Sequence, residues 1–502
     1  MTKIQDSKRK RFTKPAKSNR TVALRTSAVV DKGILCRLHY RQIRKSINLP
    51  VLSETFATLK HPSILGANSA KKDADRFSYW AACPKEVFEF RAGQKNLFTK
   101  LQTALDKYKL EEDHETALPK GIFRGGWVGY FSYELGRYIE KLPETTIDDL
   151  QMPLIRLCFY DRFIAYDHLE ETFRLIALQT PNDTQKPQEK LAALEKLLAE
   201  SEKLHIPSPP PADIENIDFS QIRCNMSREY YLDEFAKIKR YIYDGDVYQI
   251  NFSQRFECDY NAGPIALFHW QNHYNPSPYA AYIDTGNFHI VSASPEMFVT
   301  IEDGIISTKP IKGTRPRVNE AGQGEKINAK NFDELVGSEK EQAELNMIVD
   351  LERNDIARIC EAGTRNVVQP RTIESYPTVF HAVATVAGQL RNDITFCDIL
   401  RAMFPGGSIT GAPKIRSMEI IDETEPTARG VYTGSIGYIG LDGSVSLNIA
   451  IRTIIIKNQK AFAQTGGGIV ADSDPQAEWN ETLTKARALL AGIKATQEVA
   501  KI

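Results

Sequence analysis

The sequence lacks several features that would place the protein in a specialised class. No uninterrupted apolar run approaches the roughly 20 residues needed to span a bilayer, and the N-terminus has no apolar signal-peptide core. The cysteines are odd in number, far apart and never in a CxxC pair, so neither a disulfide framework nor a zinc site is indicated. We therefore expect a cytoplasmic protein, with no membrane interaction and with reduced thiols at Cys36, Cys83, Cys158, Cys224, Cys258, Cys360 and Cys397.

Net charge is also lacking, because 64 basic and 64 acidic side chains cancel, but the charges are unevenly spread. Residues 1–45 contain fourteen Lys or Arg against Asp6 and Asp31, a balance of +12 that leaves −12 for the remaining chain. Such an arm could bind nucleic acid, target an organelle or be a solvated tail, and we favour a disordered tail. The acidic body offers no basic face to extend a nucleic-acid site, so an enzyme should survive deletion of residues 1–45.

A proline-rich segment divides the chain. Four prolines fall within residues 207–211, and proline cannot continue the helical pattern that precedes them at 185–200. We therefore predict a linker at 204–222. It separates an N-terminal accessory region at 46–203 from a catalytic region at 223–495.

What the sequence does contain, with 42% hydrophobic and 25% charged residues, is ordinary for a globular protein. Segments at 153–168 and 172–179 are rich in β-branched and aromatic residues and are predicted to form paired strands, and a helix is predicted over Ser227–Asp244. Further strand patterns, broken by Gly or Asp-Gly turns, lie at 247–258, 278–308 and 430–466. These patterns predict an α+β fold with mostly antiparallel sheets.

A first cluster of acids lies on a predicted helix at 338–363. Ser338 followed by Glu341 predicts a capping box, and apolar residues such as Ile348 and Leu351 continue at helical spacing. Glu344 falls on the same inward stripe. A buried charge without a partner is costly, so Glu344 should have one.

A second cluster lies on a helix predicted to begin at Asp474 and Pro475. Glu478, Glu481 and Lys485 share one face of this helix, which alone would be read as an exposed salt-bridged surface. Three glycines precede it, at Gly466, Gly467 and Gly468, and their amides can approach an anion closely. Carboxylates beside an anion-binding segment suggest a bridging hard cation such as Mg²⁺.

Seven motifs in order resemble the chorismate-binding catalytic region shared by anthranilate, isochorismate and aminodeoxychorismate synthases, over about 227–490. The motifs are GDVYQINFSQRF, SASPE, PIKGTRPR, KEQAELNMIVDLERND, FPGGSITGAPK, IAIRT and GGGIVADSDPQAEWNETLTKA. The segment Gly125–Pro143 also resembles part of the accessory region of that family. The resemblance implies large, mostly antiparallel sheets packed as a sandwich, with helices on the outside.

The resemblance also implies the residues of a dianion site. Glu344 and Glu481, with Glu478 close by, would hold Mg²⁺, which would take the ring carboxylate of chorismate. A fixed guanidinium fork suits a planar anion, so Arg452 would take the enolpyruvyl carboxylate. Tyr432 and the amides around Gly466 to Gly468 would assist it. Further substrate contacts are implied for Gln249, Thr314, Ser408 and Lys485.

Two catalytic roles follow from the same resemblance. Glu296, in SASPE, matches an acid placed near the C4 hydroxyl, where it would need a raised pKa to donate a proton at neutral pH. His381 matches a histidine that faces the ring. Without the resemblance, His381 would be interpreted as a packed strand or helix residue.

Lys312 distinguishes between the reactions of this family. The isochorismate synthases carry a lysine base where Gln249 stands here, so activation of water is disfavoured. Anthranilate synthases have a small residue where Lys312 stands, which leaves room for ammonia at C2. Lys312 therefore resembles the nucleophile of the aminodeoxychorismate synthases. On its sequence alone, the segment Lys309–Arg317 would be interpreted as a solvated basic loop.

A lysine nucleophile would explain amination at C4 with retention, because two steps through a covalent intermediate replace one difficult displacement. For this role Lys312 must be neutral, which Lys309, Arg315 or desolvation would favour. No glutaminase-type cysteine is visible, so ammonia from a separate glutamine amidotransferase subunit is implied. Anthranilate synthesis is the alternative reaction. The segment Gly406–Lys414 superficially resembles a phosphate-binding loop, but Ala412 and Pro413 break the motif.

Overall fold

The computed structural model describes residues 33–66, 76–111, 118–318, 323–376 and 379–499. Its α-helices are α1 Leu49–Ala57, α2 Leu97–Asp106, α3 Pro187–Ser201, α4 Arg228–Tyr243, α5 Pro264–Tyr274, α6 Gln323–Gly337, α7 Glu339–Ala357, α8 Phe396–Met403, α9 Lys414–Thr424 and α10 Pro475–Val499. Short 3₁₀ turns include η2 Tyr133–Tyr138, η3 Phe219–Gln221 and η4 Gly407–Ile409. No helix within the described ranges has both the length and the apolar content needed to cross a bilayer.

Two large sheets form the body of the molecule. Sheet 1 contains, in spatial order, β10 Arg223–Cys224, β11 Gln249–Asp259, β23 Lys460–Ile469, β22 Thr453–Lys457, β13 His289–Ser294, β12 Tyr279–Asp284, β2 Ser63–Leu65, β3 Phe77–Ala81, β8 Arg162–Asp167, β9 Thr172–Gln179, β1 Ile34–Ile43 and β5 Tyr108–Leu110, with β19 Gly411–Ala412 beside β11. Sheet 2 contains β16 Ile311–Pro316, β18 Val379–Gln389, β15 Ile305–Lys309, β14 Met297–Glu302, β21 Val445–Asn448, β20 Ser435–Gly440, β6 Gly126–Phe131, β7 Ile155–Tyr160 and β4 Glu86–Phe90, with β17 Asn366–Ser375 beside β18.

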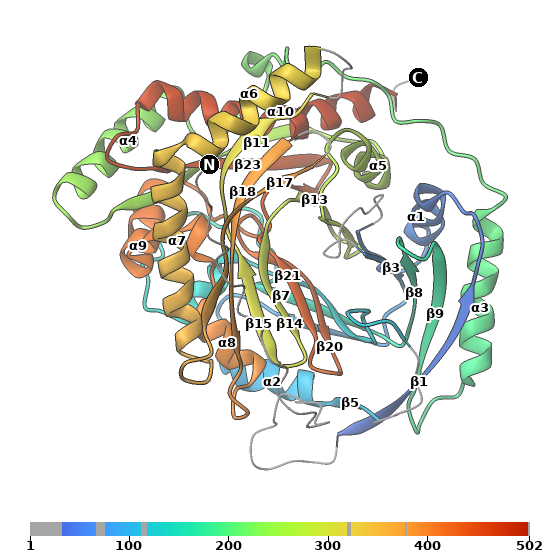
Figure 1. Cartoon of the computed structure of the whole chain (residues 1–502). Helices are drawn as coiled ribbons and strands as arrows, with labels where there is room; N and C mark the ends of the chain where they lie inside the picture. Colours follow the sequence, from blue (N-terminus) through green and yellow to red (C-terminus); the bar gives the residue numbers. More distant parts are fainter. Residues whose placement is uncertain (1–32, 67–75, 112–117, 319–322, 377–378, 500–502) are drawn as a thin grey trace, which may run out of the picture.

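The α+β class with large antiparallel sheets is confirmed. Every strand pair among the described residues is antiparallel except β1 with β5. Side chains of both sheets meet in one apolar core, in which Phe252 of β11 and Phe298 of β14 take part. Helices lie outside the sheets (Figure 1): α3 runs beside β9 and β1, and α10 packs on β23.

The local predictions hold in most places. Helix α4 follows Ser227, whose hydroxyl accepts the amide of Tyr230 at 3.1 Å, and Ser338 caps α7 in the same way. Strands β8 and β9 pair as predicted. The first part of the same segment, β7, does not join them. It belongs to sheet 2, because the chain turns at Asp161 and crosses from one sheet to the other.

The prediction of a disordered basic arm over residues 1–45 is wrong for part of that range. Residues Ile34–Ile43 form β1, which pairs with β9 along seven residue pairs from Arg37↔Gln179 to Ile43↔Phe173. Cys36 and Leu38 are buried on its inner face, so alternation with the basic residues gives the strand an apolar side. Residues 1–32 lie outside the described residues. A deletion through residue 45 would therefore remove a sheet strand and cannot serve as a neutral test.

The accessory and catalytic regions share both sheets. In sheet 1, β2 of the first region pairs with β12 of the second, and in sheet 2, β6 pairs with β20. The segment 204–222 runs over the surface between them, and its prolines contact α5: Trp270 Nε1 donates to the carbonyl of Pro210 at 2.9 Å. The two regions are thus divided in sequence but interleaved in space.

Candidate active site

Lys312 is directed by a bulge at the edge of sheet 2. Strand β16 pairs Ile311 with Val383 and Thr314 with His381, so β16 has one residue more than β18 between these pairs. Gly313 has φ +95°, and a Cβ there would lie 2.8 Å from Leu335 and 2.9 Å from Glu341. A bulge that only glycine can complete re-aims the neighbouring side chain. Lys312 is therefore held in a local backbone structure, which differs from a solvated basic loop.

The amine of Lys312 points across to sheet 1. A Cβ on Gly468 of β23 would lie 3.5 Å from Lys312 Nζ and 3.0 Å from Gln249 Nε2. Gln249 is fully buried, and its two amide atoms have no hydrogen-bond partner among the described residues. Burial lowers the pKa of Lys312, against the opposing charges of Glu344 and Glu296. A lowered pKa favours the neutral, nucleophilic amine.

Glu296 lies between β13 and β14, within electrostatic range of Lys312. Its side chain is 5% exposed, and burial raises the pKa of its carboxyl against the effects of Ser408 and Lys312. The Ser408 hydroxyl and the Ile311 amide both hydrogen-bond to this carboxyl, while Oε1 has no partner among the described residues. Glu296 thus combines a raised pKa with a free oxygen, as a general acid requires.

His381 and Thr314 form a pair on adjacent strands. Thr314 Oγ1 lies 2.9 Å from His381 Nδ1, and the ring of Tyr376 meets the imidazole edge-on with centroids 5.5 Å apart. The imidazole is 8% exposed on β18. Its packed strand position fits the interpretation from sequence alone. Its register with Thr314, two residues from Lys312, also places it at the same edge of sheet 2.

The three glycines form part of strand β23, so which of their amides could approach an anion depends on the strand pairing. Gly468 and Gly466 stand opposite Asn251 and Ser253 of β11. Those two residues donate their own amides elsewhere, to the Thr410 carbonyl at 2.8 Å and to Glu425 at 2.9 Å. In an antiparallel ladder, the facing Gly466 and Gly468 then also turn their N–H groups away from β11.

The outward amides lie where β23 has no second neighbour in the described pairings. Strand β22 pairs with β23 only between Ile454↔Ala463 and Lys457↔Lys460. The side of Gly466 and Gly468 that faces away from β11 is therefore the side that could meet an anion. Gly467 directs its N–H to β11 instead, so it contributes space and not a donor. Lys485 Nζ donates to the Gly466 carbonyl at 3.0 Å on this outward side.

Arg452 and Tyr432 lie on the same side of the site. Burial lowers the pKa of Arg452, while Tyr432 and Glu481 act in the opposite direction, so both groups are close to the guanidinium. Arg452 Nη1 donates to the Lys485 carbonyl at 3.4 Å, and its backbone has φ +50°. A non-glycine residue held in this region of φ is strained, and such strain is frequent at functional sites.

The predicted metal ligands come together only in part. A Cβ on Gly467 would lie 2.8 Å from Glu478 Oε2 and 3.7 Å from Glu481 Oε1, so both carboxylates of α10 face this glycine. Glu481 also pairs with Lys485 at 2.6 Å, as the salt-bridge interpretation predicted. Glu344, on α7, faces Lys312. No group of three His, Cys, Asp or Glu in the described ranges has the spacing of a metal site.

The electrostatics of these acids fit a cation. Burial raises the pKa of Glu478, with Ser473 opposing at 2.6 Å and Glu481 adding to the rise. Burial acts in the same direction on Glu481, but Lys485 and Lys312 outweigh it and lower its pKa. Glu478 and Glu481 repel one another beside Gly467, and Glu344 lies across the site. Such carboxylates suit Mg²⁺ whose coordination is completed by substrate oxygens. The three residues would therefore fit the ion only together with substrate oxygens, since the described residues alone form no group with the spacing of a metal site.

Several buried polar residues around this site were missed from the sequence. The Arg429–Glu425 ion pair is 1% exposed on both sides, and it ties β11 to η4 through the Asn251 and Ile409 carbonyls. Glu352 of α7 is 3% exposed behind η4. Glu352 follows Glu344 and Ile348 on the inward stripe of α7, so the periodicity that singled out Glu344 could also have found it.

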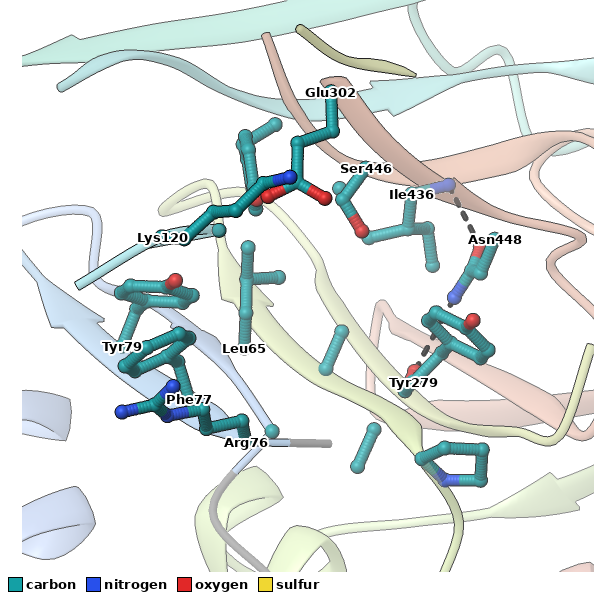
Figure 2. A pocket seen from close by; sticks show the side chains of 17 residues that line it. Leu65, Arg76, Phe77, Tyr79, Lys120, Tyr279, Glu302, Ile436, Ser446 and Asn448 are labelled. Atoms are coloured by element: carbon teal, nitrogen blue, oxygen red, sulfur yellow. Dashed lines mark hydrogen bonds between the residues drawn. The ribbon is translucent and has the colours of Figure 1, made fainter. Parts of the chain in front are cut away.

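A cavity lies between the two sheets, near the end of β14 that is remote from Glu296 (Figure 2). It has a volume of about 360 Å³ and includes Leu65, Phe77, Tyr79, Tyr279, Ile436 and Tyr438 in its lining. Glu302 and Lys120 lie at one end of it, and Asn448 bonds the Ile436 amide at 2.8 Å. Glu302 is the last residue of β14, whereas Glu296 immediately precedes that strand.

The fold and the site together define an enzyme for a small carboxylate substrate: a buried amine, an acid and an anion-facing strand edge converge between two antiparallel sheets. The protein belongs to the chorismate binding enzyme family, whose sequence model matches residues 67–491.

Relatives carry two activity names at similar identity. The chain is 40% identical to anthranilate synthase component 1 of Pseudomonas aeruginosa over 75% of this chain and 76% of that protein. It is 39% identical to aminodeoxychorismate synthase component 1 of Escherichia coli over 78% and 81%, and 38% identical to the Bacillus subtilis protein of that name over 76% and 79%. Overall identity thus does not separate the two reactions.

Solved structures agree with the fold. Anthranilate synthase component I from Streptococcus pneumoniae matches with a TM-score of 0.70 and 31% identity, over 84% of this chain and 93% of that one. The isochorismate synthase MenF from Escherichia coli matches with a TM-score of 0.66 at 15% identity, over 92% and 95%, which shows a shared fold alone.

Proposed function

We propose that the protein aminates chorismate at C4 to give 4-amino-4-deoxychorismate, on the route to para-aminobenzoate and folate. The observation that carries the proposal is Lys312 itself. Its amine has a lowered pKa and is directed by the β16 bulge toward Gly468 and Gln249. It also lies near the carboxyl of Glu296, whose pKa is raised by burial. This arrangement supplies a nucleophile and an acid together.

The reaction proceeds in two displacements. The neutral Lys312 amine forms a bond to C2, the two ring double bonds shift, and the C4 hydroxyl leaves as water with the proton of Glu296. Ammonia then bonds to C4, the double bonds shift back, and the C2–nitrogen bond to Lys312 breaks. Because each displacement occurs through the conjugated ring, C4 keeps its configuration without direct substitution.

The groups around Lys312 and Glu296 would bind the substrate. Arg452 and Tyr432, with the Gly466 and Gly468 amides, would hold the enolpyruvyl carboxylate. Glu344 and Glu481, with Glu478 beside them, would hold Mg²⁺, which would neutralise the ring carboxylate. Thr314 and Ser408 orient His381 and Glu296 respectively. Ammonia would come from a glutamine amidotransferase subunit, as the component 1 names of the relatives imply.

Anthranilate synthesis is the second candidate, and the relatives of that name favour it. Product identification by NMR and mass spectrometry, after incubation with chorismate, Mg²⁺ and ammonium at raised pH, separates the two. We expect 4-amino-4-deoxychorismate, and anthranilate as the main product would refute the proposal. Glutamine should replace ammonium only after an amidotransferase subunit is added; turnover of glutamine by this chain alone would contradict that assignment.

A further inference from the structure

Glu134 is a buried acid of the accessory region that contacts the catalytic region. It lies on η2 and is 9% exposed. Its two carboxylate oxygens accept different backbone amides: Oε1 accepts the amide of Arg429 at 2.7 Å, and Oε2 accepts that of Gly430 at 3.0 Å. The Tyr133 amide donates in return to the Gly430 carbonyl at 2.8 Å. Three hydrogen bonds thus fix one short stretch of the catalytic region to η2.

The stretch held by Glu134 begins a tight turn. The Tyr432 amide donates to the Arg429 carbonyl at 3.2 Å. Gly430 has φ +63° and Thr433 has φ +58°, and a residue with a side chain is strained in this region of φ. A strained backbone persists only where its surroundings hold it, so the contacts of this turn with other elements decide its shape.

The far end of the turn is bonded to the segment that leads to Arg452. The Thr433 amide donates to the Ala450 carbonyl, and the Ala450 amide donates to the Gly434 carbonyl, both at 2.9 Å. Ala450 comes two residues before Arg452, whose guanidinium lies within electrostatic range of Tyr432. The turn therefore carries Tyr432 and also fixes the backbone beside Arg452, the two residues proposed for the enolpyruvyl carboxylate.

The side chain of Arg429 anchors the start of the turn to the catalytic region. Its guanidinium makes five hydrogen bonds, as many as it has N–H donors. The acceptors are the Glu425 carboxylate at 2.6 and 2.9 Å, the carbonyls of Asn251 at 2.6 Å and Ile409 at 3.1 Å, and the Thr433 hydroxyl at 3.3 Å. The catalytic region thus fixes the guanidinium, and Glu134 of the accessory region fixes the backbone amide of the same residue.

Glu134 can accept both amides only as a carboxylate. Burial raises the pKa of Glu134 to about 7, with Arg137 and the Arg429 amide opposing the rise and Asp148 adding to it. Above this pH both oxygens are acceptors, whereas a protonated carboxyl would turn a donor toward one of the two amides. The ionised form is therefore matched to the turn at the raised pH at which ammonium supplies the nitrogen.

We propose that Glu134 is a positioning residue for substrate binding: through the turn at 429–434, it holds Tyr432 where the enolpyruvyl carboxylate of chorismate binds beside Arg452. This inference rests on the proposed function. In amination at C4 the enolpyruvyl group does not react, so a displaced Tyr432 weakens binding of the ground state and the transition state alike. Loss of Glu134 should therefore act on KM more than on kcat.

Glu134→Gln tests this role with chorismate and ammonium at alkaline pH. The amide keeps one acceptor for Arg429 but turns a donor toward the N–H of Gly430. We expect KM for chorismate to rise about fivefold while kcat stays within about twofold, because only a contact to a non-reacting group is weakened. Glu144→Gln, which removes an exposed charge in the same region, is the matched control and should change neither. An unchanged KM in folded Glu134→Gln overturns the proposal, whatever happens to kcat.

A double-mutant comparison separates positioning from a structural role. Tyr432→Phe removes the hydroxyl proposed for the carboxylate. In that background, Glu134→Gln should raise KM by less than about twofold, because the two changes remove one contact. A full fivefold rise in both backgrounds would show that Glu134 acts elsewhere and would overturn the proposal.

A second variant serves if Glu134→Gln does not fold, as judged by Tm and circular dichroism. Glu134→Asp keeps the charge but is one methylene shorter, so it cannot reach both amides, and KM should again rise. An unchanged KM in this variant would likewise overturn the proposal. If the product proves to be anthranilate, amination at C4 fails, but KM for chorismate can be measured on that product. An unmoved KM with either product refutes the role of Glu134 alone.

Discussion

The Lys312 site and the cavity of Figure 2 differ in the side chains that they gather. Around Lys312, charged groups converge from the sheets and from helices α7 and α10: Glu296, Glu344, Glu481, Lys485 and Arg452. The cavity in Figure 2 is lined mainly by aromatic and small side chains, with Lys120 and Glu302 at one end and Arg76 away from them. Burial of charge lowers stability unless the charges are used or paired. Buried charge is thus concentrated at the Lys312 site, which is the region that we propose for the chemistry.

The largest expected effect is at Lys312. Lys312→Arg should reduce kcat by about 1,000-fold or more, because a guanidinium stays protonated and cannot attack C2. Wild-type protein with chorismate and Mg²⁺, but without ammonia, should accumulate an adduct of chorismate less one water on the peptide that contains Lys312. Mass spectrometry checks both proteins. No adduct, together with an active arginine variant, would leave Lys312 as electrostatic support only.

The second-largest effect is expected at the carboxylates of α10. Glu481→Gln should lower turnover on the order of 100-fold, and EDTA should abolish it, because the ring carboxylate loses its counter-charge. Substrate-free Tm should fall only slightly, because the change removes the Lys485 ion pair but also relieves repulsion with Glu478. Glu498→Gln, exposed near the end of the same helix, is the matched control. Full activity in metal-free buffer would defeat this prediction.

One glycine at the Lys312 site and one in the cavity give a matched pair of substitutions. Gly468→Ala places a methyl group against the flexible ends of Gln249 and Lys312, so kcat/KM should fall about tenfold while Tm changes little. Gly66→Ala, in the cavity, should instead lower Tm and leave turnover unchanged. Gly66 has φ +82°, and a Cβ there would lie 2.6 Å from Ser78 Oγ. The Gly66→Ala variant should therefore have a lower Tm and an unchanged kcat. If the two variants changed kinetics and Tm equally, the distinction between the site and the cavity would be lost.

The smallest effect is expected at the rim of the cavity. Glu302→Gln should change kcat with ammonium by less than about twofold, because surface substitutions rarely disturb a distant site. Steady-state kinetics at saturating chorismate provide the measurement. A tenfold change in kcat would show that β14 couples the cavity to the Lys312 site.

The sequence predicted most of the individual elements because they obey local rules. The helix predicted from Ser227 forms, Ser338 accepts the Glu341 amide as its half of the predicted capping box, and the Gly and Asp-Gly turns delimit the hairpins. The sheet to which a strand belongs is not local: β7 and β8 are separated by one residue yet lie in different sheets. Strand β1 was hidden for a similar reason, since its basic side chains suggested a tail until β9 provided a partner.

For the site, the resemblance predicted the residues that converge, but not how they do so. The bulge at Lys312 and the outward amides of Gly466 and Gly468 depend on pairing across strands far apart in sequence. Glu352 shares the stripe of Glu344, so the periodicity predicts its burial, but its Thr308 partner on β15 depends on tertiary packing.

The interleaving of the two regions has a consequence for synthesis. Strand β6, at Gly126–Phe131, is flanked in sheet 2 by β7 and by β20 at Ser435–Gly440, so about 300 further residues must leave the ribosome before that edge is covered. Strand β2 likewise awaits β12. Such distant pairings slow folding and leave strand edges open during elongation. We therefore expect the N-terminal third of the nascent chain to expose unpaired strand edges until β12 and β20 have been synthesised.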